Sequence, residues 1–304
     1  MSKKIIYSTV MYECKEFKLF LNDYLKSVFC QVDIDFEVLI INDQADGELI
    51  RSEIASLNSN HLTIHVFDVT NKQTHIELRK RLIDLSYDLN ADVLIFSDFD
   101  ENVDCNRVKE IRNKIDNYSF VFNDFYIVDK NLNRLGKESF FGSRSIPRDI
   151  DNWKHIKSFN YIGFGSMAIN LTEYNYRDMM FPDDIRALDW FIATKVLIDG
   201  GKGLKLDKTF ANYRQHDESF VGFDFKLTED RLAQGISIKK SHYNYFRHVC
   251  AEFEELYSDV IELERFIEEI GKDKYISIIN ARFNTNKFCW WENIKLKKEL
   301  YDDF

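Results

Sequence analysis

The amino-acid sequence predicts an α/β fold, in which helices flank a mostly parallel central sheet and a helical extension follows. Three observations lead to this prediction. Four apolar, β-rich segments recur in the first hundred residues, helical patterns separate them, and charged helical patterns fill the residues after 225. Strand, helix and strand in alternation indicate βαβ crossovers, which produce parallel strands.

The expected strands of this first part are nearly continuous apolar segments. They begin 32, 26 and 30 residues apart and span 4–10, 36–42, 62–68 and 92–98. Between them, apolar residues recur at helical spacing across 17–28, 49–57 and 76–89. Continuously apolar strands are typical of a sheet that helices cover on both faces.

The pattern changes after residue 117. Residues 118–129 and 161–170 are expected to form strands, with a polar and irregular loop region between them. Helical spacing then extends over 184–199 and ends at Gly200-Gly201, which can adopt the left-handed conformation that often follows a helix.

Length and charge limit the possible classes of protein. The chain has 304 residues, which suits about two domains, and we expect an α/β domain at 1–225 and a helical extension at 226–304. The formal net charge is −10, which weighs against nucleic acid as a partner, because binding to phosphates needs a basic surface.

Cysteine spacing and hydropathy predict a cytoplasmic protein. The five cysteines are widely scattered and form no Cys-x-x-Cys pair, which favours reduced thiols over a disulfide framework or a zinc site. No segment reaches the ~20 consecutive apolar residues that a membrane-spanning helix needs. The short apolar segment near the start is expected to be a strand and not a signal peptide.

Acidic residues follow two of the expected strands. Asp43 follows the second, and Asp98 and Asp100 follow the fourth. Ligands of open α/β sheets bind beyond the carboxyl ends of the strands. Two carboxylates at such an end offer hard oxygen ligands for Mg²⁺ or Mn²⁺, which usually bridge to a substrate phosphate. The alternative is that these residues only cap a helix or solvate a turn.

Further candidates lie near the expected helix at 184–199. Asp183 and Asp184 follow a proline, which is typical of a helix start, so capping is their simplest role. Asp189 is either a helix cap or a general base, because aspartate is a poor helix former in a helix interior.

His216 lies in a polar cluster after a short strand-like segment. Its neutral imidazole could complete the coordination of a metal ion that carboxylates already hold. A purely structural histidine is the alternative.

The order of these features along the chain is more informative than any one of them. It runs through Tyr12, Asp43, Arg79, Asp98-Phe99-Asp100, Asp189-Trp190, Gly200-Gly201 and Tyr213-Arg214-Gln215-His216. This order resembles the family-2 glycosyltransferases with the GT-A fold, over roughly residues 3–222. It is most similar to the branch that builds bacterial surface polysaccharides, including rhamnosyl-type transferases.

The resemblance implies a metal-dependent enzyme with a nucleotide-sugar donor. Asp100 and His216 would hold a divalent metal, Mn²⁺ or Mg²⁺, and Asp98 would contact the metal, a water on it or the ribose. In the same donor site, Asp43 would contact the nucleotide base and Tyr12 would flank it.

Arg79 would complete that donor site, with Arg81 as its alternative. Asp189 would be the base of an inverting transfer to a hydroxyl of a glycan or lipid-linked acceptor, and Asp183 and Asp184 compete for that role.

One departure from the family pattern and one motif shared with another family keep other functions open. The usual Asp-Asp-Gly-Ser turn is Asn42-Asp43-Gln44-Ala45 here, without glycine or serine. This departure favours a non-catalytic binding subunit as one alternative. The other is a phosphohydrolase of the haloacid-dehalogenase type, which also carries Asp-x-Asp after an apolar strand.

The C-terminal helices have two possible roles. They cover the sheet or form a homodimer interface, or they contact a membrane that carries the acceptor. A weak amphipathic anchor would use aromatic residues and lysines, namely Phe288, Trp290, Trp291, Lys295, Lys297 and Lys298.

Overall fold

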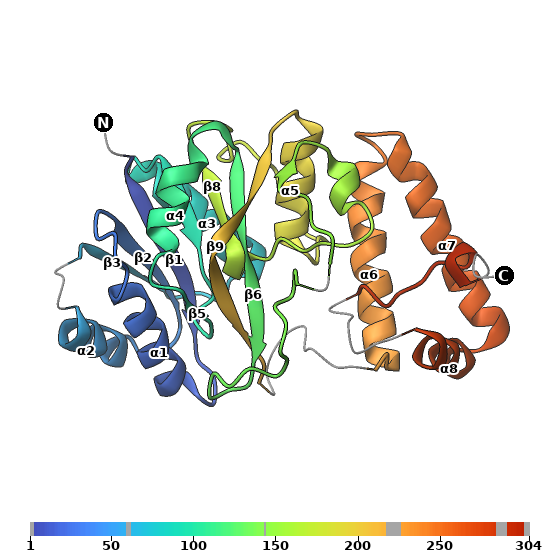
Figure 1. Cartoon of the computed structure of the whole chain (residues 1–304), viewed down its shortest axis with the longest axis horizontal. Helices are drawn as coiled ribbons and strands as arrows, with labels where there is room; N and C mark the ends of the chain where they lie inside the picture. The colour runs from blue at the N-terminus through green and yellow to red at the C-terminus, as the bar shows by residue number, and fades with distance from the viewer. Residues whose placement is uncertain (1–2, 59–61, 143, 217–225, 284–290, 301–304) are drawn as a thin grey trace. The chain divides into compact units, whose positions relative to one another are not determined.

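The structure is a computed structural model and describes residues 3–58, 62–142, 144–216, 226–283 and 291–300. The chain divides into two units (Figure 1). The first, which we call the sheet unit, comprises residues 1–155, 162–181 and 192–218. The second, the helical unit, comprises residues 156–161, 182–191 and 219–304.

Strands and helices alternate at the start of the sheet unit, as the sequence predicts. The elements are β1(Ile5–Tyr12), α1(Phe17–Phe29), β2(Glu37–Asp43), α2(Gly47–Leu57), β3(Ile64–Val69), α3(His75–Asp88) and β4(Val93–Phe96). β1 is parallel to both β2 and β4, and β2 is parallel to β3. This confirms the expected βαβ crossovers.

The remaining strands extend the same sheet. They are β5(Asn102–Val103), β6(Phe120–Val128), β7(Asp149–Ile150), β8(Met167–Asn170) and β9(Gly203–Arg214), with α4(Arg107–Lys114) between β5 and β6. The strand order is β3-β2-β1-β4-β8-β6-β9-β5, and β7 pairs with β9. β8 is antiparallel to β4 and β6, whereas β6 and β9 are parallel.

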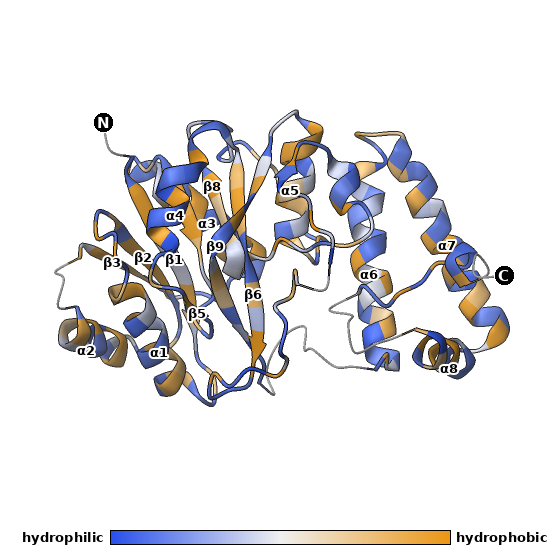
Figure 2. Cartoon of the chain, in the orientation of Figure 1, coloured by the Kyte–Doolittle hydropathy of each residue, from blue (hydrophilic) through white to orange (hydrophobic). Residues whose placement is uncertain are grey.

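Hydrophobic burial and local capping explain these elements. The side chains of β1, β2 and β4 are almost entirely buried, and Figure 2 shows hydrophobic residues along β1 and β2 and both polar and apolar residues on α1 and α2. Thr74 and Glu77 form a reciprocal capping box at the start of α3, which fixes where that helix begins.

The helix expected at 184–199 begins later than the sequence pattern indicates. α5(Leu188–Ile198) starts at Leu188. The preceding Asp183 and Asp184 lie in an exposed turn, in which the N–H of Ile185 donates to the carbonyl of Pro182. The turn bond replaces the first helical bonds, so the Pro-Asp-Asp segment precedes the helix instead of starting it.

The helical unit is built around an aromatic core. It contains α6(Glu229–Phe246), α7(Glu252–Ile270) and α8(Lys272–Arg282). The indole of Trp190 stacks on His242, with ring centroids 3.7 Å apart, and on Trp291, at 5.4 Å. Its Nε1 donates to the carbonyl of Ile156 at 2.7 Å, which satisfies the buried polar atom.

Part of the proposed amphipathic anchor lies within the described residues. Trp291 is buried in the helical unit, and Lys297 and Lys298 pair with acidic residues of α7. Phe288 and Trp290 lie outside the described residues. Among the helices that the structure describes, none is both long and apolar enough to span a membrane. Membrane contact and dimerisation stay predictions.

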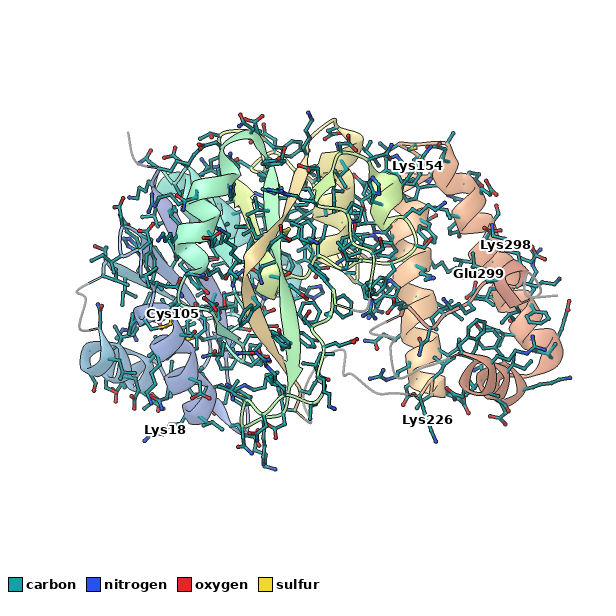
Figure 3. All side chains as sticks on the ribbon, in the orientation of Figure 1. Lys18, Cys105, Lys154, Lys226, Lys298 and Glu299 are labelled. Carbon is teal, nitrogen blue, oxygen red and sulfur yellow. A yellow bond between two sulfur atoms is a disulfide. The ribbon has the colours of Figure 1, made fainter. Side chains whose placement is uncertain are left out.

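The prediction of reduced cysteines is wrong for one pair. Cys30, at the end of α1, and Cys105, after β5, form a disulfide, with their Cα atoms 5.4 Å apart (Figure 3). The N–H of Val32 donates to the carbonyl of Cys105, and Gln31 Nε2 donates to the carbonyl of Asp104. The fold brings together residues that are 75 positions apart, and cysteine spacing carries no information about such contacts.

Removing the disulfide should lower the stability of the sheet unit. A disulfide between residues so far apart in the sequence constrains the unfolded chain. We therefore expect a dithiol reductant to lower the free energy of unfolding by about 2–4 kcal/mol. Urea unfolding with and without reductant measures this change, and a thiol titration in denaturant should find two more thiols after reduction.

The double variant Cys30→Ser/Cys105→Ser is the matched control, because reductant should not change its unfolding midpoint. An unchanged midpoint for the unmodified protein would contradict a stabilising disulfide.

Candidate functional site

Three parallel strands bring predicted donor-site residues to one edge of the sheet. β1, β2 and β4 run in the same direction, so their carboxyl ends share an edge. The register places Tyr12 opposite Asp43, and each is the last residue of its strand. Asp98 follows β4 shortly after its end. Ligands of open α/β sheets bind at this kind of edge.

The turn after β2 forms without a glycine. Gln44 has a φ of 64°, in the left-handed region that glycine adopts most readily. Asn42 holds the turn, because its Oδ1 accepts from the N–H of Ala45 at 2.9 Å and its Nδ2 donates to Asp68 at 2.8 Å. Oδ1 of Asp43 is buried and accepts no hydrogen bond from the described residues, so its capacity to accept one is unused.

Arg79 and Asp98 form an ion pair at the same edge. Arg79 lies on α3, and its guanidinium pairs with the carboxylate of Asp98 and lies 4.7 Å from the ring centroid of Phe164. Burial raises the pKa of the Asp98 carboxyl, and the positive charge of Arg79 opposes that rise. It is therefore Arg79 that the fold places beside the acidic segment.

A short antiparallel pairing joins this acidic segment to the end of β9. Asn102 lies opposite Asn212, and the Nδ2 of Asn212 donates to the Oδ1 of Asn102 at 3.2 Å. In an antiparallel pair, the residues before one strand position lie beside those after the other. Nε2 of His216 consequently lies 2.9 Å from Oδ2 of Asp100.

Aromatic side chains pack within and against this acidic segment. Phe99 is almost completely buried, and its ring meets that of Tyr12 edge to face, with centroids 4.8 Å apart. Tyr12 itself remains 40% exposed. Burial of its hydroxyl and the charges of Asp100 and Asp98 raise the pKa of Tyr12, so the phenol stays protonated and can donate a hydrogen bond.

Glu101 is a site residue that sequence reasoning missed. Its side chain is 4% exposed, and burial together with the charges of Asp98 and Asp100 raises its pKa well above the usual range. A Cβ atom on Gly165 would lie 1.9 Å from Oε2 of Glu101, so glycine there permits the close approach. The sequence signal that could have identified it is its position directly after Asp100, just beyond an apolar strand.

The donor atoms of Asp100 and His216 fit a divalent metal ion. Ligand atoms bound at about 2.1 Å to one octahedral ion lie about 3 Å apart, close to the 2.9 Å observed. A carboxylate suits Mg²⁺ or Mn²⁺, and an imidazole suits transition metals, so the pair favours Mn²⁺. No group of three or more His, Cys, Asp or Glu among the described residues could hold an ion. Two protein ligands leave positions for phosphate oxygens and water.

The candidate bases lie in the helical unit. Asp189 is in the first turn of α5, where the helix dipole favours a negative charge, and its Oδ1 accepts from the N–H of Trp190 at 2.7 Å. Asp183 and Asp184 are exposed in the preceding turn. The role of Asp189 as a base stays a prediction.

The raised pKa of Glu101 should make stability depend on pH. A carboxyl whose pKa is higher in the folded state contributes stability at low pH and loses it as the pH rises through the folded value. In metal-free buffer with EDTA, Glu101→Gln should therefore gain about 1 kcal/mol or more over the unmodified protein between about pH 4 and pH 8. Urea unfolding at several pH values measures the difference.

Glu48→Gln, at an exposed position of α2, is the control for the same change in chemistry. A constant difference between Glu101→Gln and the unmodified protein across the pH range would contradict the raised pKa.

Comparisons with known proteins identify the fold but no sequence family. No family model matches the sequence, and no curated protein is significantly similar to it. Solved structures do match. S. aureus TarS, residues 1–349, has a TM-score of 0.58 and 13% identity, and the match covers 86% of this chain and 72% of that one.

Two further matches were solved with ligands. A mannosyltransferase of Pyrobaculum calidifontis in complex with GDP-Man and Mn²⁺ has a TM-score of 0.55 and 11% identity, covering 100% of this chain and 89% of that one. GalNAc-T7 with UDP, GalNAc and Mn²⁺ has a TM-score of 0.51 and 16% identity, covering 88% of this chain and 54% of that one. Together with the strand order and the site at the carboxyl edge, these likenesses show that the chain has the GT-A fold of glycosyltransferases.

Proposed function

We propose that this protein is an inverting, metal-dependent glycosyltransferase. It takes a hexose or deoxyhexose from a nucleoside diphosphate sugar and transfers it to a hydroxyl of a glycan or lipid-linked acceptor. The surface-polysaccharide role rests on the sequence resemblance, and the cytoplasmic location rests on the hydropathy pattern of the sequence. The GT-A fold, and the nucleotides and Mn²⁺ held by proteins of similar structure, support a donor of this class.

The observation that carries the proposal is the meeting of Asp100 and His216. The two residues come from segments 116 positions apart, and their donor atoms lie 2.9 Å apart at the carboxyl edge of the sheet. His216 is 3% exposed and Asp100 is 16% exposed, so neither side chain is a solvated surface group. The sequence left a solvated turn or a helix cap as the alternative for the acidic residues, and neither of these would require the pairing with His216.

Asp100 and His216 would hold the metal ion, with Asp98 beside them. When bound, the ion would supply the positive charge that stabilises the departing nucleoside diphosphate. The net charge of −10 makes such local neutralisation more necessary, since the diphosphate itself is anionic. Arg79 keeps the carboxylate of Asp98 oriented through their ion pair.

Tyr12 and Asp43 would bind the nucleoside. Oδ1 of Asp43 can accept a hydrogen bond from the base, because the described residues give it none. The partly exposed ring of Tyr12 lies next to it in the sheet register and can flank the base or ribose.

Asp189 would remove the proton from the acceptor hydroxyl. A hydroxyl is a weak nucleophile, so a carboxylate that takes its proton raises its reactivity. In an inverting reaction the nucleophile attacks the sugar on the face opposite the leaving group. The hydrogen bond from the N–H of Trp190 orients the Asp189 carboxylate at the start of α5.

Donor binding should depend on the metal ion and on its two ligands. Calorimetry with UDP, GDP and dTDP in Mn²⁺ should find a nucleotide that binds, and EDTA should weaken that binding at least tenfold. Asp100→Asn should have the same effect, because it removes the charge that attracts the ion. Equal affinity in EDTA and in Mn²⁺ would contradict the proposed site.

The matched control is Asp199→Asn, because Asp199 lies on the surface and pairs with Lys195.

Two assays distinguish the proposed function from its alternatives. Slow release of nucleotide from a nucleotide sugar would separate an enzyme from a non-catalytic subunit, and release of phosphate from a simple phosphomonoester would favour the phosphohydrolase.

The base assignment predicts a selective loss of transfer. Asp189→Asn keeps the hydrogen bond to the N–H of Trp190 but cannot take a proton, so kcat should fall about 10²- to 10⁴-fold while Mn²⁺-dependent nucleotide binding is retained. Sugar-transfer assays and calorimetry on the same samples measure the two effects. Asp183→Asn and Asp184→Asn are the controls, and a loss that falls on either of them instead would assign the base there.

A further inference from the structure

Helix α1 contacts both halves of the candidate metal site. Phe20, on the buried face of α1, has its ring 5.0 Å from that of His216 and 6.3 Å from that of Phe99. Phe99 lies between Asp98 and Asp100 in the chain, and Phe17 of the same helix meets it at 5.7 Å. One helix therefore packs against the acidic segment and against the histidine that meets it.

The side chain of Arg214 connects the end of β9 to helix α1. Arg214 is the last residue of β9, comes just before His216 and has a completely buried side chain. Its Nη2 lies 2.8 Å from Oδ2 of Asp23 on α1, and its Nη1 donates to the carbonyl of Lys130 at 2.7 Å. The guanidinium also lies 4.6 Å from the ring centroid of Phe20. These contacts fix the end of β9 against α1.

An ion pair between a fully buried guanidinium and a carboxylate that is 21% exposed specifies geometry more than it adds stability. The cost of removing the guanidinium from water offsets most of the attraction, whereas loss of the Asp23 carboxylate leaves the guanidinium buried without its ionic partner. Arginine can hold a carboxylate, a carbonyl and an aromatic ring at once because its guanidinium is planar and has several donors, and lysine cannot. The interaction therefore suits the task of holding two segments in one arrangement.

We propose that Asp23, Arg214 and Phe20 are positioning residues, which hold His216 and Asp100 at the separation that one divalent cation requires. Asp23 and Arg214 set the place of the β9 end, and Phe20 sets the packing of the imidazole against the Phe99 segment. None of the three binds the ion. The inference rests on the proposed function, because it assumes that Asp100 and His216 are metal ligands.

The effect should resemble the loss of other groups that orient metal ligands, which usually weakens metal affinity about 10- to 100-fold. Arg214→Lys retains the charge, so a loss of affinity in this variant cannot come from net charge. Phe20→Leu retains an apolar side chain of similar size and removes only the flat ring, which provides a second, independent variant that is expected to fold.

The test is a titration of the whole 304-residue chain with Mn²⁺ alone, in which electron paramagnetic resonance measures the free ion. Arg214→Lys, Asp23→Asn and Phe20→Leu should each raise the Mn²⁺ dissociation constant about 10- to 100-fold. In transfer assays, excess Mn²⁺ should restore most of kcat, because the ligands themselves are unchanged.

The matched control is Asp33→Asn. Asp33 also pairs with a largely buried arginine, Arg112, which donates to the carbonyl of Lys3 just before β1, at the amino end of that strand. Asp33→Asn should lower the melting temperature without changing the Mn²⁺ dissociation constant.

The outcomes separate the inference from the function on which it rests. The inference is overturned if two results are found together. The Arg214 and Phe20 variants would keep the Mn²⁺ affinity of the unmodified protein and show only a lower melting temperature, and Asp100→Asn would still abolish Mn²⁺ binding. If Asp100→Asn binds Mn²⁺ as well as the unmodified protein, the proposed metal site fails, and the positioning role fails with it.

Discussion

The pairing between β5 and β9 is the interaction on which the candidate site depends. It involves only Asn102 and Val103 against Asn212 and Ala211. The pairing brings two segments together. One is the acidic segment that follows β4 at the carboxyl edge of the sheet, and the other is the end of β9, which leads to the histidine. A shift of this register by one residue would turn the side chains to the opposite face and separate Asp100 from His216. So short a ladder needs support from its surroundings.

Helix α1 supplies that support along its length. Phe17 and Phe20 pack against the ring of Phe99 in the acidic segment, and Asp23 pairs with Arg214. The disulfide from Cys30, just after the helix, reaches the second residue after β5. Gln31 adds to this connection, since its side chain donates to the carbonyl of Asp104 and accepts from the N–H of Val108. The same helix thus fixes the backbone on both sides of β5, and this packing determines the geometry of the candidate site.

The sequence predicted the elements whose signals are local and missed those that depend on distant contacts. Apolar periodicity identified the first four strands and three helices, and strand ends identified Asp43 and Asp98. The Cys30–Cys105 pairing was missed because nothing in the sequence near either residue reports their proximity. Glu101 was passed over because its burial comes from the approach of Gly165. The absence of glycine after Asp43 counted against an active enzyme, but Gln44 adopts a left-handed φ and the side chain of Asn42 holds a tight turn there.

Binding of one divalent ion by Asp100 and His216 together, at the carboxyl edge of the sheet, can be observed in a crystal. The most direct measurement is the anomalous X-ray scattering of Mn²⁺ in crystals of the protein grown with a nucleoside diphosphate. If the two residues share one ion, a peak should lie within about 2.3 Å of both Oδ2 of Asp100 and Nε2 of His216. A nucleotide bound at this edge without such a peak, or with the peak on other residues, would contradict it.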